Sequence, residues 1–320
     1  MSNFDFSPAE RPTFYYIGVT TTKSSIMKVF PKWAEYLSLG NTPIVGIDCK
    51  IHADPQVYRK VVCFIKNDKN SLGALVTSHK IDLYDAAKDL FDKVDSYANL
   101  LGELSCISKK GGKLWGHAKD PITSGLSLES FIPKNHWKNT GAEICIIGAG
   151  GASLALTIYI MQKLKRNNSP TKIYMTNRSA PRLEKMKKIH EKVNTGVKVD
   201  YIHCVSPEEN DEIVNKLKSG SLTINGTGLG KDTPGSPITK AAQFPENGFA
   251  WDYNYRGDLV FLEQARAQKE ERNLHVEDGW MYFLYGWTSV IAEVFHVKIP
   301  TSGPSFDAIS KIAEGERDKK

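Results

Sequence analysis

The chain has 320 residues, 41% of them hydrophobic, which is enough material for two ordinary domains with separate cores. The formal net charge of +6 is mild, and no arginine-rich stripe or aromatic platform indicates a nucleic-acid-binding protein. No apolar run approaches the roughly 20 residues that a membrane span requires. These features favour a protein that binds phosphorylated or carboxylated small molecules.

Five cysteines are scattered singly, without a CxxC pair or a cluster with histidine. This pattern argues against a disulfide framework and a zinc site, so we expect no metal and a reducing compartment. Residues 1–12 are polar and lack the pattern of a signal peptide. We therefore expect a cytoplasmic monomer or homodimer with a small-molecule substrate and no nucleic-acid or membrane partner.

The first part of the chain predicts alternating strands and helices. Strands are expected at 13–21, 42–51 and 72–80, and helices at 26–39, interrupted by Pro31, and at 57–68. Residues 81–102 also carry apolar side chains at helical spacing. Segment 104–118 indicates two short strands around the turn Gly111–Gly112, and 126–133 has helical content.

A glycine-rich turn follows the apolar run 144–147 and precedes the helix-compatible segment 154–164. Gly148, Gly150 and Gly151 allow close approach of a pyrophosphate, and a helix N-terminus attracts its charge. Incidental glycines are the alternative, since Ser153 stands where a third glycine is often found. A second strand at 172–178 arrives at the right distance and favours a dinucleotide-binding Rossmann domain.

The alternation continues with a helix at 179–193, a strand at 198–204, a helix at 207–218 and a strand at 221–230. It predicts parallel sheets with right-handed crossovers in both halves. The apolar segment 279–297 is long enough to pack back on the N-terminal half. We therefore expect a two-lobed α/β protein. A substrate-binding catalytic domain at 1–120, with 276–320 packed on it, would precede an NAD(P)-binding Rossmann domain at 121–275.

Two arginines follow the second strand of the expected Rossmann domain. Arg178 and Ser179 lie at its end, and Arg182 comes one helical turn later. An acidic residue there would bind the free ribose 2′-hydroxyl of NAD, whereas guanidinium groups suit the 2′-phosphate of NADP. The arginines could also be ordinary surface charges. The pattern predicts NADP as cofactor, with NAD as the alternative.

Polar clusters follow three strands of the N-terminal half, at Thr21–Ser25, Thr77–Lys80 and His117–Asp120. Each alone is ordinary turn chemistry. Because ligands of open parallel sheets bind at the carboxyl ends of strands, the set favours one substrate cleft. A lysine–aspartate pair there can move a proton at a carbinol, since the ammonium stabilises the developing alkoxide and the carboxylate holds the lysine.

Taken together, the motifs resemble the shikimate dehydrogenase family, in order over nearly the whole chain. The family's GAGGA is matched identically at Gly148–Ala152, and its Asn-Arg-Thr by Asn177–Ser179. Its Asn-Ala-Thr-Pro-Leu-Gly is matched by Asn225–Gly230, and its Asp-x-x-Tyr by Asp252–Tyr255. The resemblance implies cofactor contacts from Gly148, Gly150, Gly151, Ala152, Asn177, Arg178, Ser179, Arg182, Thr227, Gly228, Leu229, Gly279 and Met281.

The substrate-side motifs have diverged. Val-Thr followed by a lysine appears as Val76–Lys80, and the segment ending in the family's aspartate appears as Gly116–Asp120. The resemblance thus implies Lys80 and Asp120 as the catalytic pair. Leu75 and Ser105 stand where the family has asparagines, and Tyr285 where it has a glutamine. The substrate-binding residues that it implies are Thr22, Ser24, Thr77, Ser105, Tyr255 and Tyr285.

These replacements remove groups that would bind ring hydroxyls, and a buried polar group without a partner costs roughly 1–3 kcal/mol. The resemblance therefore implies an NADP-dependent oxidoreductase that transfers hydride to or from the carbinol carbon of a cyclic polyol or hydroxy acid other than shikimate. The alternatives are a genuine shikimate or quinate dehydrogenase, a folate-type methylene dehydrogenase and a catalytically inactive NADP-binding regulatory protein.

Overall fold

The computed structural model describes residues 6–164, 167–193, 196–231 and 233–317, so the first residues of the polar N-terminal segment lie outside the described part. The chain divides into two compact units. Unit 1 comprises Met1–Lys119 and Leu284–Lys320, and unit 2 comprises Asp120–Phe283. Among the described residues, no helix combines the length and apolar character needed to cross a membrane.

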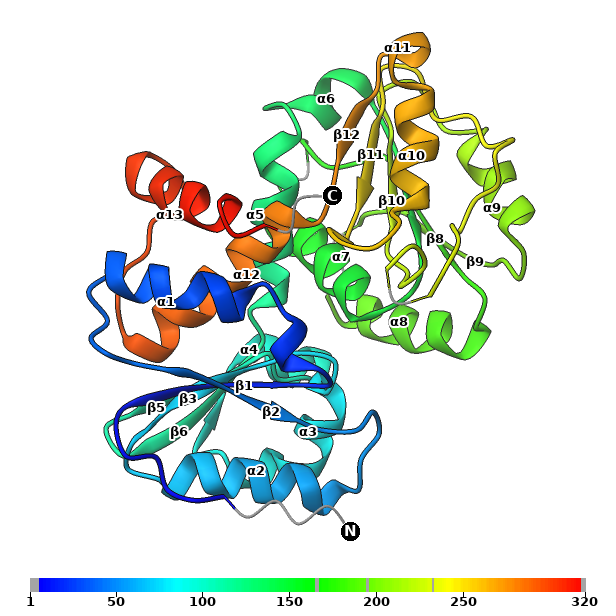
Figure 1. Cartoon of the computed structure of the whole chain (residues 1–320). Coiled ribbons are helices and arrows are strands. Elements are labelled where there is room, and N and C mark those ends of the chain that lie inside the picture. The colour runs from blue at the N-terminus through cyan, green and yellow to red at the C-terminus, as the bar shows by residue number, and fades with distance from the viewer. Residues whose placement is uncertain (1–5, 165–166, 194–195, 232, 318–320) are drawn as a thin grey trace. The chain divides into compact units, whose positions relative to one another are not determined.

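Unit 1 is built on a six-stranded sheet with the order β2-β1-β3-β5-β6-β4 (Figure 1). Its strands are β1 (Thr13–Gly18), β2 (Ile44–Asp48), β3 (Ser71–Val76), β4 (Lys93–Val94), β5 (Cys106–Lys110) and β6 (Lys113–His117). β1 pairs in parallel with β2 and β3, whereas β5 is antiparallel to both β3 and β6. The expectation of a parallel sheet in this half is therefore only partly right, since β5 runs against both of its neighbours and the Gly111–Gly112 turn joins it to β6 as a hairpin.

The helices of unit 1 depart from the sequence prediction at Pro31 and over 81–102, and α13 (Pro304–Glu314) was not predicted. They are η1 (Thr21–Lys23), α1 (Ile26–Tyr36), α2 (Pro55–Asn67), α3 (Lys80–Ala87), η2 (Lys88–Leu90), α4 (Ser96–Leu101) and α13 (Pro304–Glu314), together with most of α12 (Trp280–Phe295). The expected interruption at Pro31 is wrong, since α1 continues through it and buries Phe30 and Trp33. The Trp33 Nε1–H also donates to the Ile309 carbonyl at 2.9 Å.

The single helical segment expected at 81–102 is also wrong. The chain leaves the helix after α3 and pairs β4 with β6. Asp95 then caps α4 by accepting a hydrogen bond from the Ala98 N–H at 2.7 Å, and Gly102 ends that helix with a φ of 65°. The helix cap at Asp95, the helix end at Gly102 and the pairing of β4 with β6 therefore determine the structure of this segment, although its apolar residues have helical spacing.

Both faces of the unit 1 sheet are covered. Phe14 packs against Phe30 of α1 and Trp287 of α12, at centroid distances of 5.3 and 6.3 Å. Tyr15, the next residue, contacts Phe64 of α2 at 5.4 Å. Successive side chains of a strand point to opposite faces, so α1 and α12 cover one face and α2 the other.

Unit 2 carries a six-stranded, all-parallel sheet with the order β12-β11-β10-β7-β8-β9. Its strands are β7 (Ile144–Ile147), β8 (Ile173–Asn177), β9 (Val199–His203), β10 (Leu222–Asn225), β11 (Phe249–Asp252) and β12 (His275–Glu277). Its helices are α5 (Asp120–Phe131), α6 (His136–Thr140), α7 (Gly151–Lys163), α8 (Ala180–Val193), α9 (Pro207–Val214), α10 (Val260–Ala267) and α11 (Lys269–Arg272). This doubly wound arrangement confirms the predicted α/β class and the Rossmann-type sheet.

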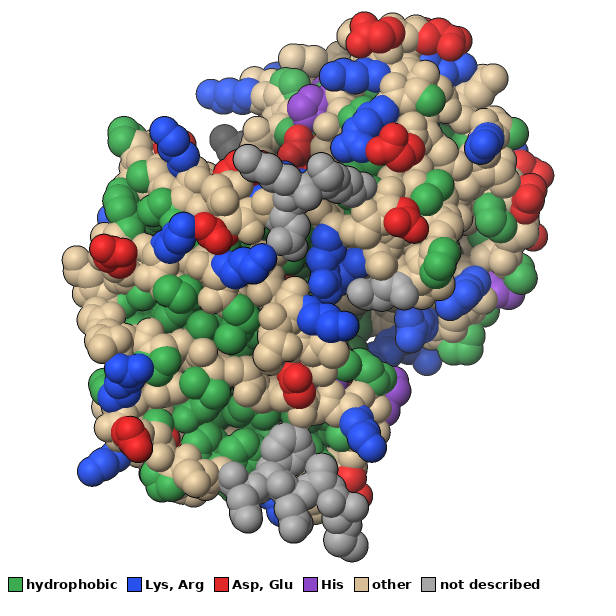
Figure 2. Space-filling view, viewed as in Figure 1, with side chains coloured by type: hydrophobic (Ala, Val, Ile, Leu, Met, Phe, Trp, Pro, Cys, Tyr) green, Lys and Arg blue, Asp and Glu red, His purple; other side chains and the backbone are tan. Residues whose placement is uncertain are grey.

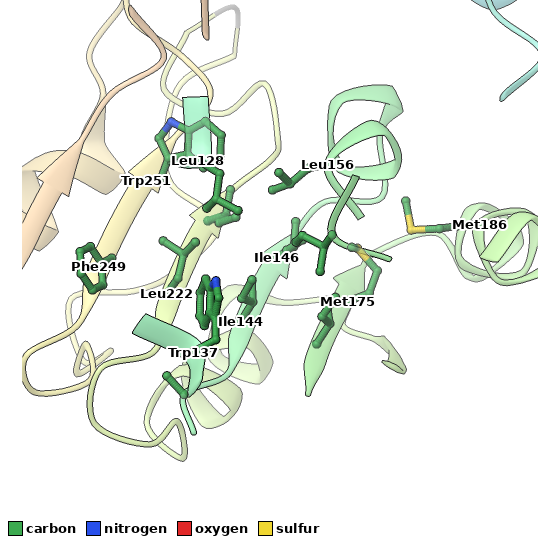
Figure 3. Close-up of a cluster of buried hydrophobic side chains, with 14 of the residues drawn as sticks. Leu128, Trp137, Ile144, Ile146, Leu156, Met175, Met186, Leu222, Phe249 and Trp251 are labelled. Atoms are coloured by element: carbon green, nitrogen blue, oxygen red, sulfur yellow. The ribbon is translucent and has the colours of Figure 1, made fainter. Parts of the chain in front are cut away.

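Two hydrophobic clusters lie on opposite faces of this sheet. Ile144 and Ile146 of β7 belong to the first cluster, with Leu156 of α7 and Met186 of α8 (Figure 3). Cys145 and Ile147 point the other way, into a second cluster with α10 residues. The apolar run at 144–147 is therefore buried on both faces, as a central parallel strand requires.

Candidate active site

The glycine loop of unit 2 joins β7 to the N-terminus of α7. Gly148 has a φ of 106°, and a Cβ there would lie 2.8 Å from the Gly226 carbonyl oxygen. A residue with a side chain therefore does not fit at this position. Gly150 caps α7 without a side-chain hydrogen bond, and Gly151 at the first helical position is exposed. The first-turn N–H groups of α7 are thus open to an anion, which fits a dinucleotide pyrophosphate.

Asn177 ties the glycine loop to the end of the next strand. Its Oδ1 accepts a hydrogen bond from the Ala149 N–H at 3.3 Å, and its Nδ2 donates to the Ser179 carbonyl at 3.1 Å. Arg178 and Arg182 are exposed, and neither forms an ion pair within the residues that the structure describes. Figure 2 shows lysine and arginine side chains gathered where α8 lies in Figure 1. The two guanidinium groups are therefore accessible to solvent and can bind the phosphate group of a ligand.

The loop after β10 is held by hydrogen bonds from the side-chain amides of Asn225 and Asn254, which lie in the two matched motifs 225–230 and 252–255. The Asn225 Oδ1 accepts hydrogen bonds from the N–H and hydroxyl of Thr227 at 3.0 and 2.6 Å. The Asn254 Nδ2 donates to the Thr227 carbonyl at 3.0 Å, and the Thr227 hydroxyl accepts from the Leu229 N–H at 3.2 Å. Thr227, Gly228 and Leu229 are therefore positioned beside the glycine loop, since Gly148 approaches Gly226 and Thr227.

Asp252, at the end of β11, is the buried carboxyl of this network. Its Oδ2 accepts from the Asn225 Nδ2 at 2.9 Å, and its Oδ1 from the Asn254 N–H at 2.8 Å. Burial raises the pKa of Asp252 to about 7. The hydrogen bonds lower the pKa, but their effect is smaller than that of burial. Gly279 packs closely against the segment that follows Asp252. A Cβ at Gly279 would lie 2.0 Å from the Tyr253 carbonyl oxygen.

The raised pKa of Asp252 predicts that the protein loses stability as pH rises. An unfolded chain releases this proton near pH 4, whereas the folded protein keeps it until about pH 7. The contribution is therefore full below pH 4 and is lost between about pH 4 and 7. Urea unfolding measures the free energy of unfolding at each pH in this range. From pH 4 to 7 it should fall less for Asp252→Asn than for the wild type. An equal fall in both proteins would contradict the assignment.

In unit 1, the segments that follow β1 and β3 and the residue that precedes β5 lie at one edge of the sheet. β1 and β3 run in parallel, so Gly18 and Val76 end at the same edge. Ser105 precedes β5 at this edge, because its neighbour Cys106 pairs with both Leu75 and His117. Thr22, exposed in η1, and Ser24, half-buried, follow β1 directly. The loops carrying Thr22, Thr77 and Ser105 are therefore brought to one edge, as strand-end chemistry predicts.

The loop that carries Lys80 is rigidly held by His79. This side chain is fully buried; its Nε2 lies 3.1 Å from the Gly18 carbonyl and its Nδ1 lies 3.1 Å from the Tyr58 hydroxyl. Ser78 adopts a φ of 60°, a left-handed conformation that costs roughly 1–3 kcal/mol in a residue with a side chain. His79 thus anchors the strained turn, and Lys80 opens α3 directly after it.

A half-buried cluster of polar side chains fixes the chain just before Asp120. The Ser105 hydroxyl accepts a hydrogen bond from the Lys119 N–H at 2.8 Å, and the Lys119 Nζ lies 2.6 Å from Glu293 of α12. Burial raises the pKa of Glu293, but the hydrogen bond from Lys119 and the charge of His117 outweigh it, so the pKa lies below its usual value. Sequence patterns did not indicate this cluster, because Lys119 and Glu293 lie 174 residues apart.

The remaining predicted residues are divided between the units. Lys80 and Tyr285 belong to unit 1, whereas Asp120 and Tyr255 belong to unit 2. Tyr285 is buried, and its hydroxyl donates to the Thr301 carbonyl at 3.3 Å. Tyr255 is half-buried against Trp280 and Phe283, at centroid distances of 5.4 and 5.0 Å. Met281 is half-buried on α12.

Unit 2 is a Rossmann-type unit with an open helix N-terminus, and it is joined to a second α/β unit with polar strand ends. This combination is typical of two-domain dinucleotide-binding folds. No family model matches the chain. It is 27% identical over 196 residues to the shikimate dehydrogenase (NADP(+)) of Streptococcus sanguinis, a match that covers 61% of this chain and 63% of that protein. The chain thus spans under two thirds of the length of the curated relatives that it matches.

Solved structures share the fold over nearly the whole chain. The shikimate dehydrogenase of Aquifex aeolicus superposes with a TM-score of 0.70 at 20% identity, covering 98% of this chain and 100% of that one. The quinate dehydrogenase of Corynebacterium glutamicum, solved with NAD, gives 0.70 at 14% identity, with 95% and 99% covered. The 5-ketofructose reductase of Gluconobacter gives 0.67 at 16% identity, with 96% and 99% covered. The resemblance drawn from the motifs is confirmed as a similarity: the sequence is similar to that of shikimate dehydrogenase (NADP(+)), and the fold is shared with solved shikimate and quinate dehydrogenases.

Proposed function

We propose that the protein is an NADP-dependent oxidoreductase that moves a hydride to or from the carbinol carbon of a cyclic polyol or hydroxy acid. The observation that carries this proposal is the combination of an open glycine loop in unit 2 with Lys80 on a rigid strand-end turn in unit 1. Its relatives include shikimate dehydrogenase (NADP(+)). The proposed substrate domain comprises 1–120 with 276–320, and the proposed cofactor domain comprises 121–275.

Lys80 and Asp120 are the proposed catalytic pair. In the direction of reduction, the Lys80 ammonium donates its proton to the carbonyl oxygen as negative charge develops there. In the direction of oxidation, the same side chain takes up the proton of the alcohol. Asp120 is proposed as the carboxylate partner of this lysine, because a negative charge beside an ammonium favours its charged form. NADP supplies the hydride acceptor or donor when it is bound.

The proposed cofactor residues fit NADP. The first turn of α7, with Gly150 and Gly151, would hold the pyrophosphate through N–H groups. Arg178 and Arg182 would bind the 2′-phosphate, and no acidic side chain follows β8 in segment 177–183 to bind a free 2′-hydroxyl. Thr227–Leu229, with Gly279 and Met281, would line the other side of the cofactor. NAD is the weaker alternative.

The proposed substrate is not shikimate. Leu75 offers no hydrogen bond, and the hydroxyls of Ser105 and Tyr285 already bond to backbone groups. Thr22, Ser24, Thr77 and Tyr255 remain to bind a carboxylate or hydroxyl groups. A site built for hydrogen bonds rejects mismatched partners strongly. We therefore expect a kcat/KM for shikimate below about 10⁴ M⁻¹s⁻¹, the lower end of the ordinary enzyme range.

Steady-state assays test this specificity. Shikimate, quinate, myo-inositol and gluconate should be compared as alcohol substrates with NADP⁺, following the absorbance of NADPH. A value for shikimate at or above the stated limit would show that the substitutions are compensated and would favour a genuine shikimate dehydrogenase. Retained NADPH binding with no turnover of any such alcohol would instead favour the regulatory protein.

A further inference from the structure

A tyrosine outside the predicted site contacts the proposed catalytic carboxylate. The hydroxyl of Tyr282, on α12, donates a hydrogen bond to the Asp120 Oδ1 at 3.0 Å. Both residues belong to unit 2, and both are half-buried. A hydrogen bond to an ionised carboxylate is stronger than one between neutral groups, so it can restrain the rotamer of Asp120.

The ring of Tyr282 is itself held in place. It packs against Tyr253 at a centroid distance of 5.6 Å and against Trp251 at 6.4 Å. Trp251 is fully buried in β11, and its Nε1–H donates to the Asp278 carbonyl at 3.1 Å. The phenol is therefore presented to Asp120 from a fixed aromatic cluster rather than from a mobile side chain.

The backbone of Asp120 is fixed independently of its side chain. Asp120 is the first residue of α5, and its carbonyl accepts a hydrogen bond from the buried Ser124 hydroxyl at 2.7 Å. The preceding residue, Lys119, is bound by Glu293. The backbone is thus held on both sides of Asp120. The side chain of Asp120 can still rotate about its own bonds, and the hydrogen bond from Tyr282 restrains this rotation.

We propose that Tyr282 is a positioning residue for Asp120. Its hydrogen bond to Oδ1 restrains the rotamer of the carboxylate, which is the proposed partner of Lys80 in catalysis. This role rests on the proposed function of Asp120 and Lys80. A small misplacement of a catalytic group can cost up to about 10²-fold in rate. Tyr282→Phe should therefore lower kcat by about 10-fold or more and leave the Kd for NADPH unchanged.

The chain offers a matched control in the same aromatic cluster. Within the described residues, the buried Tyr253 hydroxyl has no hydrogen-bond partner. Tyr253→Phe removes the same atom from a neighbouring ring and should leave kcat unchanged. A merely structural role for the cluster would make the two variants behave alike. Thermal unfolding of both variants checks that each is folded at the assay temperature.

The decisive experiment is a double-mutant cycle with Asp120→Asn. It uses the full chain, NADP⁺ and whichever of shikimate, quinate, myo-inositol and gluconate the wild type oxidises fastest. Tyr282→Phe should lower kcat in the wild-type background and have little further effect in the Asp120→Asn background, because the two residues act as one unit. A Tyr282→Phe enzyme with the kcat of Tyr253→Phe, or one whose loss persists undiminished in Asp120→Asn, would overturn the inference.

The two proposals fail in different ways. Wild-type activity in Asp120→Asn, or no turnover of any of the four alcohols, would contradict the proposed function and remove the role of Tyr282 with it. Loss of activity in Asp120→Asn combined with full activity in Tyr282→Phe would contradict only the positioning role.

Discussion

Replacing Lys80 with alanine should lower kcat by about 10²- to 10⁴-fold, the range of general acid–base catalysis, while the Kd for NADPH stays unchanged. The reason is that the lysine interacts most strongly with charge that develops on the substrate oxygen in the transition state. Asp120→Asn should cause a loss of the same order, because an amide cannot stabilise the ammonium. Rates with saturating NADP⁺, together with fluorescence titration of NADPH, measure both quantities.

The double variant of Lys80 and Asp120 should be little worse than either single variant, since the members of a catalytic unit are not additive. Lys60→Ala is the control for loss of a lysine, because Lys60 is exposed on α2 and has no role in the proposed site. Strictly multiplicative losses in the double variant would show that the two residues act separately. A Lys80→Ala enzyme with kcat near that of Lys60→Ala would exclude Lys80 from the chemistry.

Removing both arginines should weaken the preference for NADPH over NADH. Wild-type protein should bind NADPH more tightly than NADH, and the Arg178→Ala, Arg182→Ala double variant should lose about 10- to 100-fold of that preference. Because both guanidinium groups are exposed to water, together they should contribute roughly 1.5–3 kcal/mol, the range of a hydrogen bond to a charged group. NADH affinity should change little, because a free 2′-hydroxyl does not need these groups.

Lys192→Ala supplies the control for this loss of charge. Lys192 is exposed on the same helix, α8, 10 residues beyond Arg182, which corresponds to about 15 Å along the axis. It should leave both affinities unchanged at a fixed salt concentration. Equal or tighter binding of NADH by the wild-type protein would contradict the assignment of NADP.

The glycine loop of unit 2 was predictable because its constraints are local. Gly148 is required by its own backbone conformation and by a close approach, so a short motif carries the information. The apolar residues of β7 likewise mark a buried parallel strand by their sequence alone. Predictions that depend on such local rules describe unit 2 well.

Features that depend on distant contacts were not predictable. Tyr282 and Asp120 are 162 residues apart, and nothing in either local sequence indicates their hydrogen bond. Pro31 was expected to interrupt a helix, but burial of Phe30 and Trp33 carries α1 through it. The helical spacing of 81–102 was misleading for the same reason, because pairing of β4 with β6 divides the segment.

The measurement that tests the central claim most directly is the transfer of deuterium from NADPH labelled at nicotinamide C4. The carbonyl compound formed from the best alcohol substrate would be reduced by the wild-type protein with each of the two C4-labelled stereoisomers, and the product examined by mass spectrometry and NMR. We predict deuterium on the carbinol carbon with one stereoisomer only, and none with Lys80→Ala in the same reaction time. Product without deuterium from either stereoisomer, or no reduction at all, would contradict hydride transfer as the activity of this protein.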